Sequence, residues 1–255
     1  MSHSKVLISG VIITFNEERH IEACIKSLEG ITDEVLVVDS YSTDKTQEIC
    51  RNLGVKFIQH SFEGHIQQKN FAMQQATHDI VLSLDADERV SDEMKAAILE
   101  LRANWQCDAH VFNRYNNYCG KWLKYAWYPD RKLRLWDRNK GKWGGVNPHD
   151  SVVIEKGATT QRHSANILHY AYENEKEHLS QIEKFARIAA REKHQRGKSV
   201  FYIWHLMLNP VYRFFSTYIL KLGFIDGYYG FLYSKNAAYL NFLKYKYLWR
   251  LRKNK

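Results

Sequence analysis

The chain has 255 residues, of which 45% are hydrophobic and 25% charged, and its formal net charge is +9. With only 3 Pro and 13 Gly, this composition excludes a disordered or linker-rich chain. The positive charge favours an anionic partner, such as a nucleotide, a nucleic acid or a membrane surface. The four cysteines form no C-x-x-C pair, and the apolar run at 6–15 is too short for a secretory signal, so we expect a cytoplasmic protein.

The first hundred residues alternate strand-like and helix-like segments. Short apolar runs predict strands at Val6–Phe15, Val35–Val38, Val55–Ile58 and Ile80–Leu84. Helical periodicity and capping residues predict helices from Ile21, over Asp44–Leu53, over Ile66–Ala76 and over about Asp92–Leu101, the last capped by Ser91 or Asp92. Such alternation predicts an α/β fold with a Rossmann-like, mostly parallel sheet that carries helices on both faces.

The middle of the chain is less regular, and its last part is helical. Between about Ala109 and Tyr170 we expect strands with antiparallel pairing at Val111–Tyr115, Lys132–Trp136, Ser151–Ile154 and Ile167–Tyr170. From about Glu173 onward, apolar residues recur with helical spacing. We therefore predict an α/β domain over residues 1–172, with halves at 1–104 and 105–172, and a C-terminal helical extension over residues 173–255.

The C-terminal extension is apolar, aromatic and basic. Charged residues and a proline interrupt Val200–Tyr233, which makes a membrane-spanning helix of about 20 apolar residues a poor interpretation. The tail Lys244–Lys255 has six basic residues and no acid. This composition is typical of an element that lies on an anionic membrane surface, and the alternative is a helical subdomain that packs on the core.

Polar clusters directly follow three of the predicted parallel strands. They are Thr14–Glu17, Asp39–Asp44 and Asp85–Glu88. Ligands of open α/β sheets bind beyond the carboxyl ends of the strands, so these clusters are expected to share one site. The first supplies an aromatic face, an amide and a carboxylate, and the second a carboxylate with hydroxyl groups that suit a ribose or base. The alternative for the second cluster is that it only caps the next helix.

Asp85-Ala86-Asp87 places two carboxylates at positions i and i+2 after a predicted strand. Both can point to one side and share a hard divalent cation, Mg²⁺ or Mn²⁺, which prefers carboxylate, phosphate and water oxygens. His169 is a candidate third metal ligand at the end of another predicted strand. The alternatives are a solvated acidic turn for the two aspartates and a structural role for the histidine.

Several segments resemble the motifs of one known family. Val11–Glu18, Val37–Ser40, Gln68–Ala72 and Leu84–Glu88 resemble the family-2 glycosyltransferases of the GT-A fold. A closer resemblance, to the subgroup with lipopolysaccharide core β-1,4-glucosyltransferases, continues through Tyr128–Trp136, Trp143–Gly145 and Gly223–Gly227. The resemblance implies an inverting sugar transfer from a nucleotide-diphosphate donor, commonly UDP-linked, with Mg²⁺ or Mn²⁺.

The resemblance also implies roles for single residues. A His-Glu pair of the subgroup corresponds to His149-Asp150 here, which makes Asp150 the candidate general base, although an ordinary turn is the alternative. Asp85, Asp87 and His169 form the candidate metal site. The candidate nucleotide-sugar contacts are Phe15, Asn16, Glu17, Asp39, Asn70, Asp85 and Arg134; the last is added because an arginine can clamp phosphates.

The expected function is therefore sugar transfer to an oligosaccharide or lipid-linked acceptor, in lipopolysaccharide core or related surface-glycan synthesis, at the inner face of a bacterial cytoplasmic membrane. One alternative, a sugar-phosphate nucleotidyltransferase, is disfavoured because Thr14–Arg19 contains no glycine. Another, a basic nucleic-acid-binding module, is suggested by Phe242–Arg252, but three acidic strand ends would repel phosphates, so no nucleic-acid partner is expected. A nicotinamide-dependent dehydrogenase is disfavoured because no G-x-G-x-x-G follows the first strand.

Overall fold

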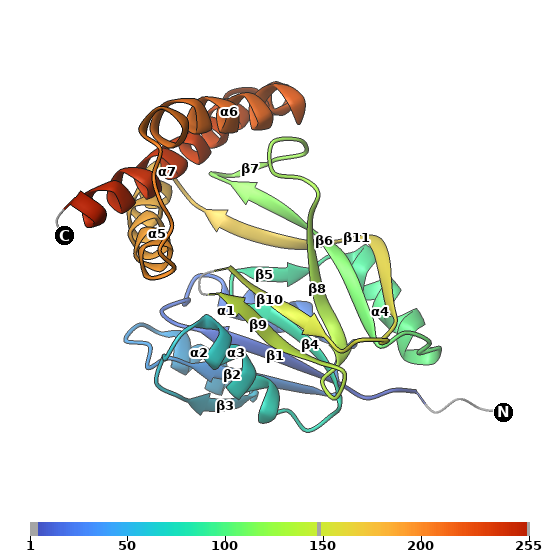
Figure 1. The fold of residues 1–255 in the computed structure, drawn as a ribbon. Helices are drawn as coiled ribbons and strands as arrows, with labels where there is room; N and C mark the ends of the chain where they lie inside the picture. The colour runs from blue at the N-terminus through green and yellow to red at the C-terminus, as the bar shows by residue number, and fades with distance from the viewer. Residues whose placement is uncertain (1–4, 147–148, 254–255) are drawn as a thin grey trace. The chain divides into compact units, whose positions relative to one another are not determined.

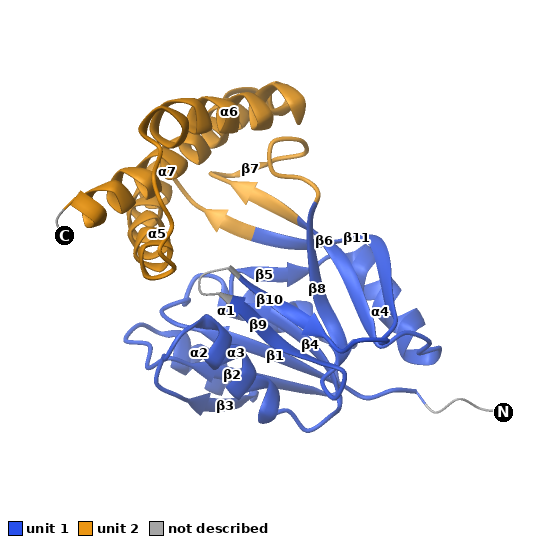
Figure 2. Ribbon diagram, viewed as in Figure 1, with its two compact units in different colours: residues 1–114, 130–169 blue, residues 115–129, 170–255 orange. Residues whose placement is uncertain are grey.

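The computed structural model describes residues 5–146 and 149–253. The chain forms two compact units (Figure 2). Unit 1 comprises residues 1–114 and 130–169, and unit 2 comprises residues 115–129 and 170–255. The second unit resumes at Tyr170, close to the predicted domain boundary at residue 172, but it also includes 115–129, a segment that was predicted from sequence to lie in the first domain.

Unit 1 contains a parallel sheet in its amino-terminal half (Figure 1). Its strands are β1 (Ile8–Thr14), β2 (Glu34–Asp39), β3 (Lys56–Gln59) and β4 (Ile80–Asp85), in the order β3-β2-β1-β4. In the register, Thr14 pairs with Asp39 and Ile13 pairs with Asp85, so three strand ends lie level with one another. The sequence therefore predicted correctly that the polar clusters share one edge of the sheet.

Antiparallel strands extend this sheet beyond β4. They are β5 (Glu88–Val90), β6 (Ala109–Tyr118), β7 (Lys121–Trp122), β8 (Asp130–Asp137) and β11 (Thr160–Tyr172). β8 pairs with both β4 and β6, and β5 pairs with β11. A separate hairpin consists of β9 (Gly141–Val146) and β10 (His149–Ile154). The predicted antiparallel strands are confirmed, whereas β5, β7 and β9 were not predicted.

Helices cover both faces of the sheet of unit 1. They are α1 (Ile21–Ser27), α2 (Thr46–Asn52), α3 (His65–Gln74) and α4 (Asp92–Ala103). Because successive side chains of a strand point to opposite faces, Ile12 of β1 packs in one apolar cluster with α1 and α4, and Val11 packs in another with α3. Ser91 caps α4 by accepting the N–H of Met94 at 3.2 Å, as the sequence predicted.

Unit 2 is mainly helical. Its helices are α5 (Glu175–Gln195), the π-helical turn Ile203–Leu208, α6 (Asn209–Phe215), the π-helical turn Ser216–Leu220, the 3₁₀ turn Gly223–Asp226 and α7 (Gly227–Lys253). Ile182 and Ala186 of α5 pack against Leu243 of α7. In the described part of the chain, none of the helices has the length and apolarity needed to cross a bilayer.

A second cluster in unit 2 is built around a buried polar network. Tyr118 and Tyr233 pack in this cluster, and the hydroxyl of Tyr118 lies 2.7 Å from Nδ1 of His178. The amide nitrogen of Asn236 donates to the same hydroxyl at 3.1 Å. Burial among these groups lowers the pKa of His178 to about 4, because the protonated imidazole would be desolvated there.

Candidate active site

The ends of β1 and β2 are joined by hydrogen bonds between the loops that follow them. The N–H of Asn16 donates to Oγ of Ser42 at 2.7 Å, and the side-chain oxygen of Asn16 accepts the N–H of Thr43 at 2.8 Å. Asn16 has a φ of 55°, a left-handed conformation that asparagine tolerates better than most residues. The N–H of Glu17 donates to Oγ1 of Thr46 at 2.9 Å, which ties the first loop to the beginning of α2 as well.

The predicted nucleotide contacts at these strand ends differ in their environments. Phe15 is exposed, with an accessible aromatic ring at the edge of the sheet. Asp39 is fully buried, and its carboxylate accepts the N–H of Ser42 at 2.9 Å and the amide of Gln59 at 3.3 Å. Asp39 thus holds its own loop in place. No contact with a nucleotide is tested by the structure, so the nucleotide-binding roles stay predictions for Phe15, Asn16, Glu17 and Asp39.

Asp85, at the end of β4, lies between two buried cations. Its Oδ1 atom is 2.8 Å from Nζ of Lys69, and its Oδ2 atom is 3.0 Å from Nη2 of Arg134. Burial alone would raise the pKa of Asp85, but the charges of Lys69 and Arg134 outweigh burial and hold that pKa well below its usual range. Asp85 is therefore a fixed anion in the protein.

Lys69 also connects Asp85 to the candidate base. Its Nζ atom lies 2.8 Å from Oδ2 of Asp150, so one ammonium group bridges two carboxylates from β4 and β10. Lys69 was not predicted as a site residue, although it lies beside Asn70 in the segment that carries the family resemblance. Only 4% of its side chain is exposed.

A cavity of about 370 Å³ opens among these groups. Five cationic side chains and two carboxylates line it, together with Leu133, Trp143, Ser151 and Val152. The charged residues are Lys69, Arg114, Arg131, Lys132, Arg134, Asp85 and Asp150. Because the cations outnumber the carboxylates, the cavity favours an anionic or highly polar ligand.

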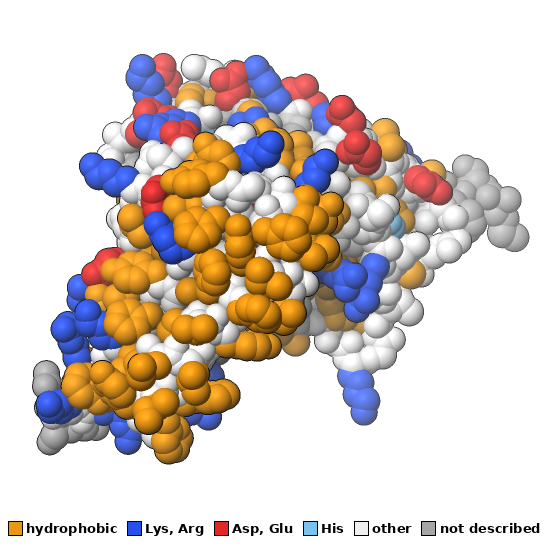
Figure 3. Space-filling view, turned by 90° about the horizontal axis from the view of Figure 1, so that it is seen from above, with side chains coloured by type: hydrophobic (Ala, Val, Ile, Leu, Met, Phe, Trp, Pro, Cys, Tyr) orange, Lys and Arg blue, Asp and Glu red, His pale blue; other side chains and the backbone are white. Residues whose placement is uncertain are grey.

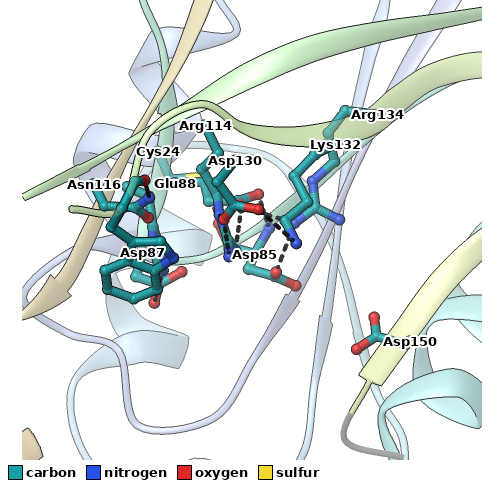
Figure 4. A network of polar contacts seen from close by, with 12 residues as sticks. Cys24, Asp85, Asp87, Glu88, Arg114, Asn116, Asp130, Lys132, Arg134 and Asp150 are labelled. Atoms are coloured by element: carbon teal, nitrogen blue, oxygen red, sulfur yellow. Dashed lines mark hydrogen bonds and ion pairs between the residues drawn. The ribbon is translucent and has the colours of Figure 1, made fainter. Parts of the chain in front are cut away.

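A network of ion pairs that includes residues of the cavity wall fixes Arg134 (Figure 4). Glu88 is fully buried and lies 2.7 Å from Nη2 of Arg134 and 3.3 Å from Nη1 of Arg114. Arg114 in turn pairs with Asp130 at 2.7 Å, and Lys132 pairs with the other oxygen of Asp130 at 3.2 Å. Buried charges persist when they are paired in this way, so the network holds the predicted phosphate-binding arginine in one position.

Asp87 and His169, two of the three candidate metal ligands, lie together. Nε2 of His169 is 3.3 Å from Oδ2 of Asp87. Among the described residues, Oδ1 of Asp87 is buried without a hydrogen-bond partner. Burial raises the pKa of Asp87, but the neighbouring imidazole outweighs that effect and lowers it overall. A buried carboxylate oxygen without a partner beside an imidazole fits a divalent cation.

Asp85 does not complete this pair in the structure, because Lys69 and Arg134 hold its two oxygens. Within residues 5–146 and 149–253, no three His, Cys, Asp or Glu side chains stand close enough together to hold a metal ion. The structure thus brings Asp87 and His169 together as predicted, and places Asp85 with the cations of the cavity. The three-ligand site stays a prediction.

Asn70 ties α3 to β9. Its amide nitrogen donates to the carbonyl of Trp143 at 2.8 Å, and its oxygen accepts the N–H of Trp143 at 3.0 Å. This pairing places the indole ring 4.3 Å from Nζ of Lys69, at a distance typical of a cation–π contact. In the structure Asn70 therefore positions the wall of the cavity, and its predicted closeness to the donor is untested.

Asp150 lies at the beginning of β10, where it pairs with Gly145 of β9. The preceding residues of the predicted turn, Asn147 and Pro148, and the side chain of His149 lie outside the described part of the chain. The structure thus brings Asp150 to the same cavity as Asp85, a proximity across 65 residues that the sequence alone does not reveal.

Comparisons with known proteins agree with this architecture. The model of the family "Glycosyl transferase family 2" matches residues 9–162. An uncharacterised glycosyltransferase of Rickettsia bellii is 30% identical over 254 residues, which cover 93% of this chain and 84% of that protein. The lipopolysaccharide core biosynthesis glycosyltransferase LpsC of Rhizobium meliloti is 25% identical over 255 residues, covering 94% and 90%.

A solved structure is similar over nearly the whole chain. The mannosyltransferase PcManGT of Pyrobaculum calidifontis, in complex with GDP-Man and Mn²⁺, superposes with a TM-score of 0.58 and is 16% identical. The match covers 96% of this chain and 88% of that one. At this identity the likeness speaks for the fold, and it confirms the predicted GT-A architecture. Because the family model spans more than half of the residues, the chain belongs to glycosyl transferase family 2.

Proposed function

We propose that this glycosyltransferase transfers a hexose, with inversion, from a nucleotide-diphosphate donor such as a UDP-hexose to a saccharide acceptor. One observation carries the proposal: Lys69 bridges Asp85, at the end of a nucleotide-binding type of sheet, and Asp150, a carboxylate that lines the same cavity. An inverting transfer needs a general base that reaches the acceptor hydroxyl in the same cavity from which the diphosphate leaves, and Asp150 lines one cavity together with Asp85.

The donor half of the proposal rests on unpaired groups at the cavity. Nε of Arg134 and Nε1 of Trp143 are buried without hydrogen-bond partners among the described residues. Both residues line the cavity, and each of these nitrogen atoms carries an N–H group that can donate a hydrogen bond. Oxygen atoms of a sugar or a phosphate would satisfy both donors, whereas an apolar ligand would leave them unpaired.

A divalent cation would be held by Asp87 and His169. Asp85, the other carboxylate of the Asp85-Ala86-Asp87 motif, is the proposed third ligand. When bound, Mg²⁺ or Mn²⁺ supplies Lewis-acid stabilisation of the charge that grows on the leaving diphosphate. The chain contributes fixed positive charge of its own through Arg134, which Glu88 and Asp85 hold in place. Electrostatic groups that are already positioned need little rearrangement in the transition state.

Asp150 would act as the general base. Its carboxylate would accept the proton of the acceptor hydroxyl while that oxygen bonds to the anomeric carbon and the bond to the diphosphate breaks. Lys69 holds Oδ2 of Asp150 at 2.8 Å, so it positions the carboxylate for this step. Attack from the face opposite the leaving group inverts the anomeric centre.

The acceptor half of the proposal rests on the relatives. LpsC, which is similar over 94% of this chain, is described as a lipopolysaccharide core biosynthesis glycosyltransferase. We therefore propose an acceptor from lipopolysaccharide core or a related surface glycan, either lipid-linked or as an oligosaccharide. The observations favour neither of the alternatives considered from sequence, a sugar-phosphate nucleotidyltransferase or a nucleic-acid-binding module.

A panel of nucleotide sugars, each assayed for hydrolysis and for thermal stabilisation of the protein with and without Mn²⁺, tests this function. We expect one donor to be hydrolysed slowly and to stabilise the folded protein, because a ligand that binds only the native state raises its stability. NMR of the first sugar product would show the inverted anomer. If no nucleotide sugar is hydrolysed or stabilises the chain under either condition, the proposal is wrong.

A further inference from the structure

Unit 2 exposes a continuous apolar surface, which we call the apolar face. It is formed by Trp204, Met207, Leu208, Val211, Tyr212 and Phe215. Each of these residues is between 48% and 67% exposed. Their spacing of three and four residues places them along one side of the helical segment 203–215. Neither the turn Ile203–Leu208 nor α6 has a buried residue. An amphipathic helix normally buries such a stripe, so this one is left without a partner within the described chain.

The apolar face lies in a segment that has almost no negative charge. Between Lys193 and Lys255 the sequence contains twelve lysines and arginines and a single acid, Asp226. Asp226 is buried, and its carboxylate accepts the N–H groups of Lys124, Tyr125 and Ala126 at 2.8, 3.0 and 2.8 Å. Asp226, the one acid of the segment, is therefore already hydrogen-bonded within unit 2.

The space-filling view shows the same pattern. Figure 3 shows hydrophobic side chains gathered into a broad area, with Lys and Arg side chains at its margins. Arg213 and Lys221 are exposed and belong to the same helical region as the apolar face. Exposed apolar patches of this kind mark contact sites, and the surrounding charge selects the class of partner.

We propose that the apolar face of unit 2 docks on the surface of an anionic phospholipid bilayer. A bilayer interface offers hydrocarbon for Met207, Leu208 and Val211 directly beside negative headgroups for the lysines and arginines. The amphipathic rings of Trp204 and Tyr212 suit the headgroup level. Arg196 and Lys235 pair with Glu192 and Glu175, but the other basic residues still leave the segment with a clear excess of positive charge. The charge complementarity between this excess and an anionic surface decides in favour of this partner.

Two other partners fit the same residues less well. A second copy of the chain would bring two strongly basic segments together, which costs electrostatic repulsion. A nucleic acid would attract the charge but would offer no hydrocarbon to the aliphatic side chains of the apolar face. The membrane proposal is also independent of the reaction in unit 1, because it requires no substrate and no metal ion.

Flotation of the full chain with lipid vesicles tests the proposal. We expect the protein to float with vesicles of phosphatidylcholine and phosphatidylglycerol, and to float far less with phosphatidylcholine alone or at high salt. The double substitution Met207→Glu and Val211→Glu should weaken binding at least about tenfold, because it places two charges on the inserted face. Both side chains are exposed, so the substitutions remove no core contact.

Leu99→Glu is the matched control, because Leu99 is also an exposed apolar residue on a helix but lies in unit 1. It should float like the wild type. A second readout is quenching of tryptophan fluorescence by brominated phosphatidylglycerol, which we expect to fall markedly in Trp204→Phe. The proposal is overturned if the wild type does not float with anionic vesicles or if the double variant floats equally well. It is also overturned if sedimentation shows that the wild type is a dimer and the double variant a monomer.

Discussion

The Nζ atom of Lys69 lies 2.8 Å from Oδ1 of Asp85. The same nitrogen lies 2.8 Å from Oδ2 of Asp150, so a single buried cation connects the acidic motif at the end of β4 with the candidate base on β10. Two carboxylates that face one cavity would otherwise repel each other. The arrangement makes Lys69 the residue that joins the donor side of the proposed reaction to its acceptor side.

Replacing Lys69 by methionine should therefore reduce activity strongly. The substitution keeps an unbranched side chain of similar length but removes the charge that holds Asp85 and Asp150. We expect kcat/KM to fall about a hundredfold, in the range seen when a preorganised electrostatic contact is lost. Lys26→Met, at an exposed lysine of α1, is the control and should change kcat/KM little. Activity of Lys69→Met within about threefold of the wild type would contradict this assignment.

Asp150→Asn should separate catalysis from donor binding. The amide cannot accept the proton of the acceptor hydroxyl, so kcat should fall by about two to four orders of magnitude. The affinity for UDP should stay nearly unchanged, because Asp150 is proposed to act on the acceptor. Asp150→Glu, which restores a carboxylate, should recover part of kcat, and Glu155→Gln, near the end of the same hairpin, is the neutralising control. A normal kcat in Asp150→Asn would exclude it as the base.

Acid should weaken unit 2 through His178. Its pKa is lowered to about 4 in the folded protein, whereas an unfolded histidine titrates near 6.5. Between these values the unfolded chain binds a proton that the folded chain does not, so stability falls as the pH drops from 6.5 toward 4, by about 3 kcal/mol at most. Above pH 6.5 the two states are equally deprotonated, and the contribution is fully present.

Urea unfolding at about pH 7 and about pH 4 measures this effect. In His178→Gln, which cannot be protonated, the loss of unfolding free energy on acidification should be smaller than in the wild type. His194→Gln, on the same helix near its end, is the control and should lose as much stability as the wild type. An identical acid-induced loss in His178→Gln would contradict the assignment.

Gly230 of α7 is at a close contact that admits no side chain. A Cβ atom there would lie 1.9 Å from the carbonyl oxygen of Gly223 and 2.8 Å from Cβ of Asp226. Alanine ordinarily stabilises a helix relative to glycine, but here the clash should dominate and lower the free energy of unfolding by about 3 kcal/mol. Thermal melting would show this, with the exposed Tyr228→Ala as a control that changes little. A higher melting temperature for Gly230→Ala would contradict the packing described here.

The strands of the parallel sheet and the clustering of their polar ends were predictable from sequence. Apolar runs such as Ile80–Leu84 are followed at once by acids, and the geometry of parallel sheets then places the acids on one edge. β9 was missed because Gly141–Val146 contains three glycines, which are uncommon in strands. The position of β9 in the cavity wall depends on Asn70 of α3, whose side chain hydrogen-bonds to the backbone of Trp143 in β9.

The cations of the cavity were harder to predict. In a sequence, Lys69 on a helix indicates a solvated surface, because lysine is rarely buried without a partner. Its burial depends on Asp150, which comes from a hairpin 81 residues later in the chain. Glu88 was included in the predicted polar cluster Asp85–Glu88 but was given no role of its own, since only the fold brings Arg114 and Arg134 to it. Such partnerships are tertiary, and no local pattern encodes them.

The proposed metal-dependent binding of a nucleotide diphosphate is tested most directly by calorimetric titration of UDP with and without Mn²⁺. Oδ1 of Asp87 is buried without a hydrogen-bond partner among the described residues, and His169 lies beside the same carboxylate. We predict that Mn²⁺ strengthens UDP binding at least about tenfold in the wild type and that Asp87→Ala abolishes this gain. Equal affinity with and without Mn²⁺, for UDP and for every other nucleoside diphosphate tried, would contradict the account.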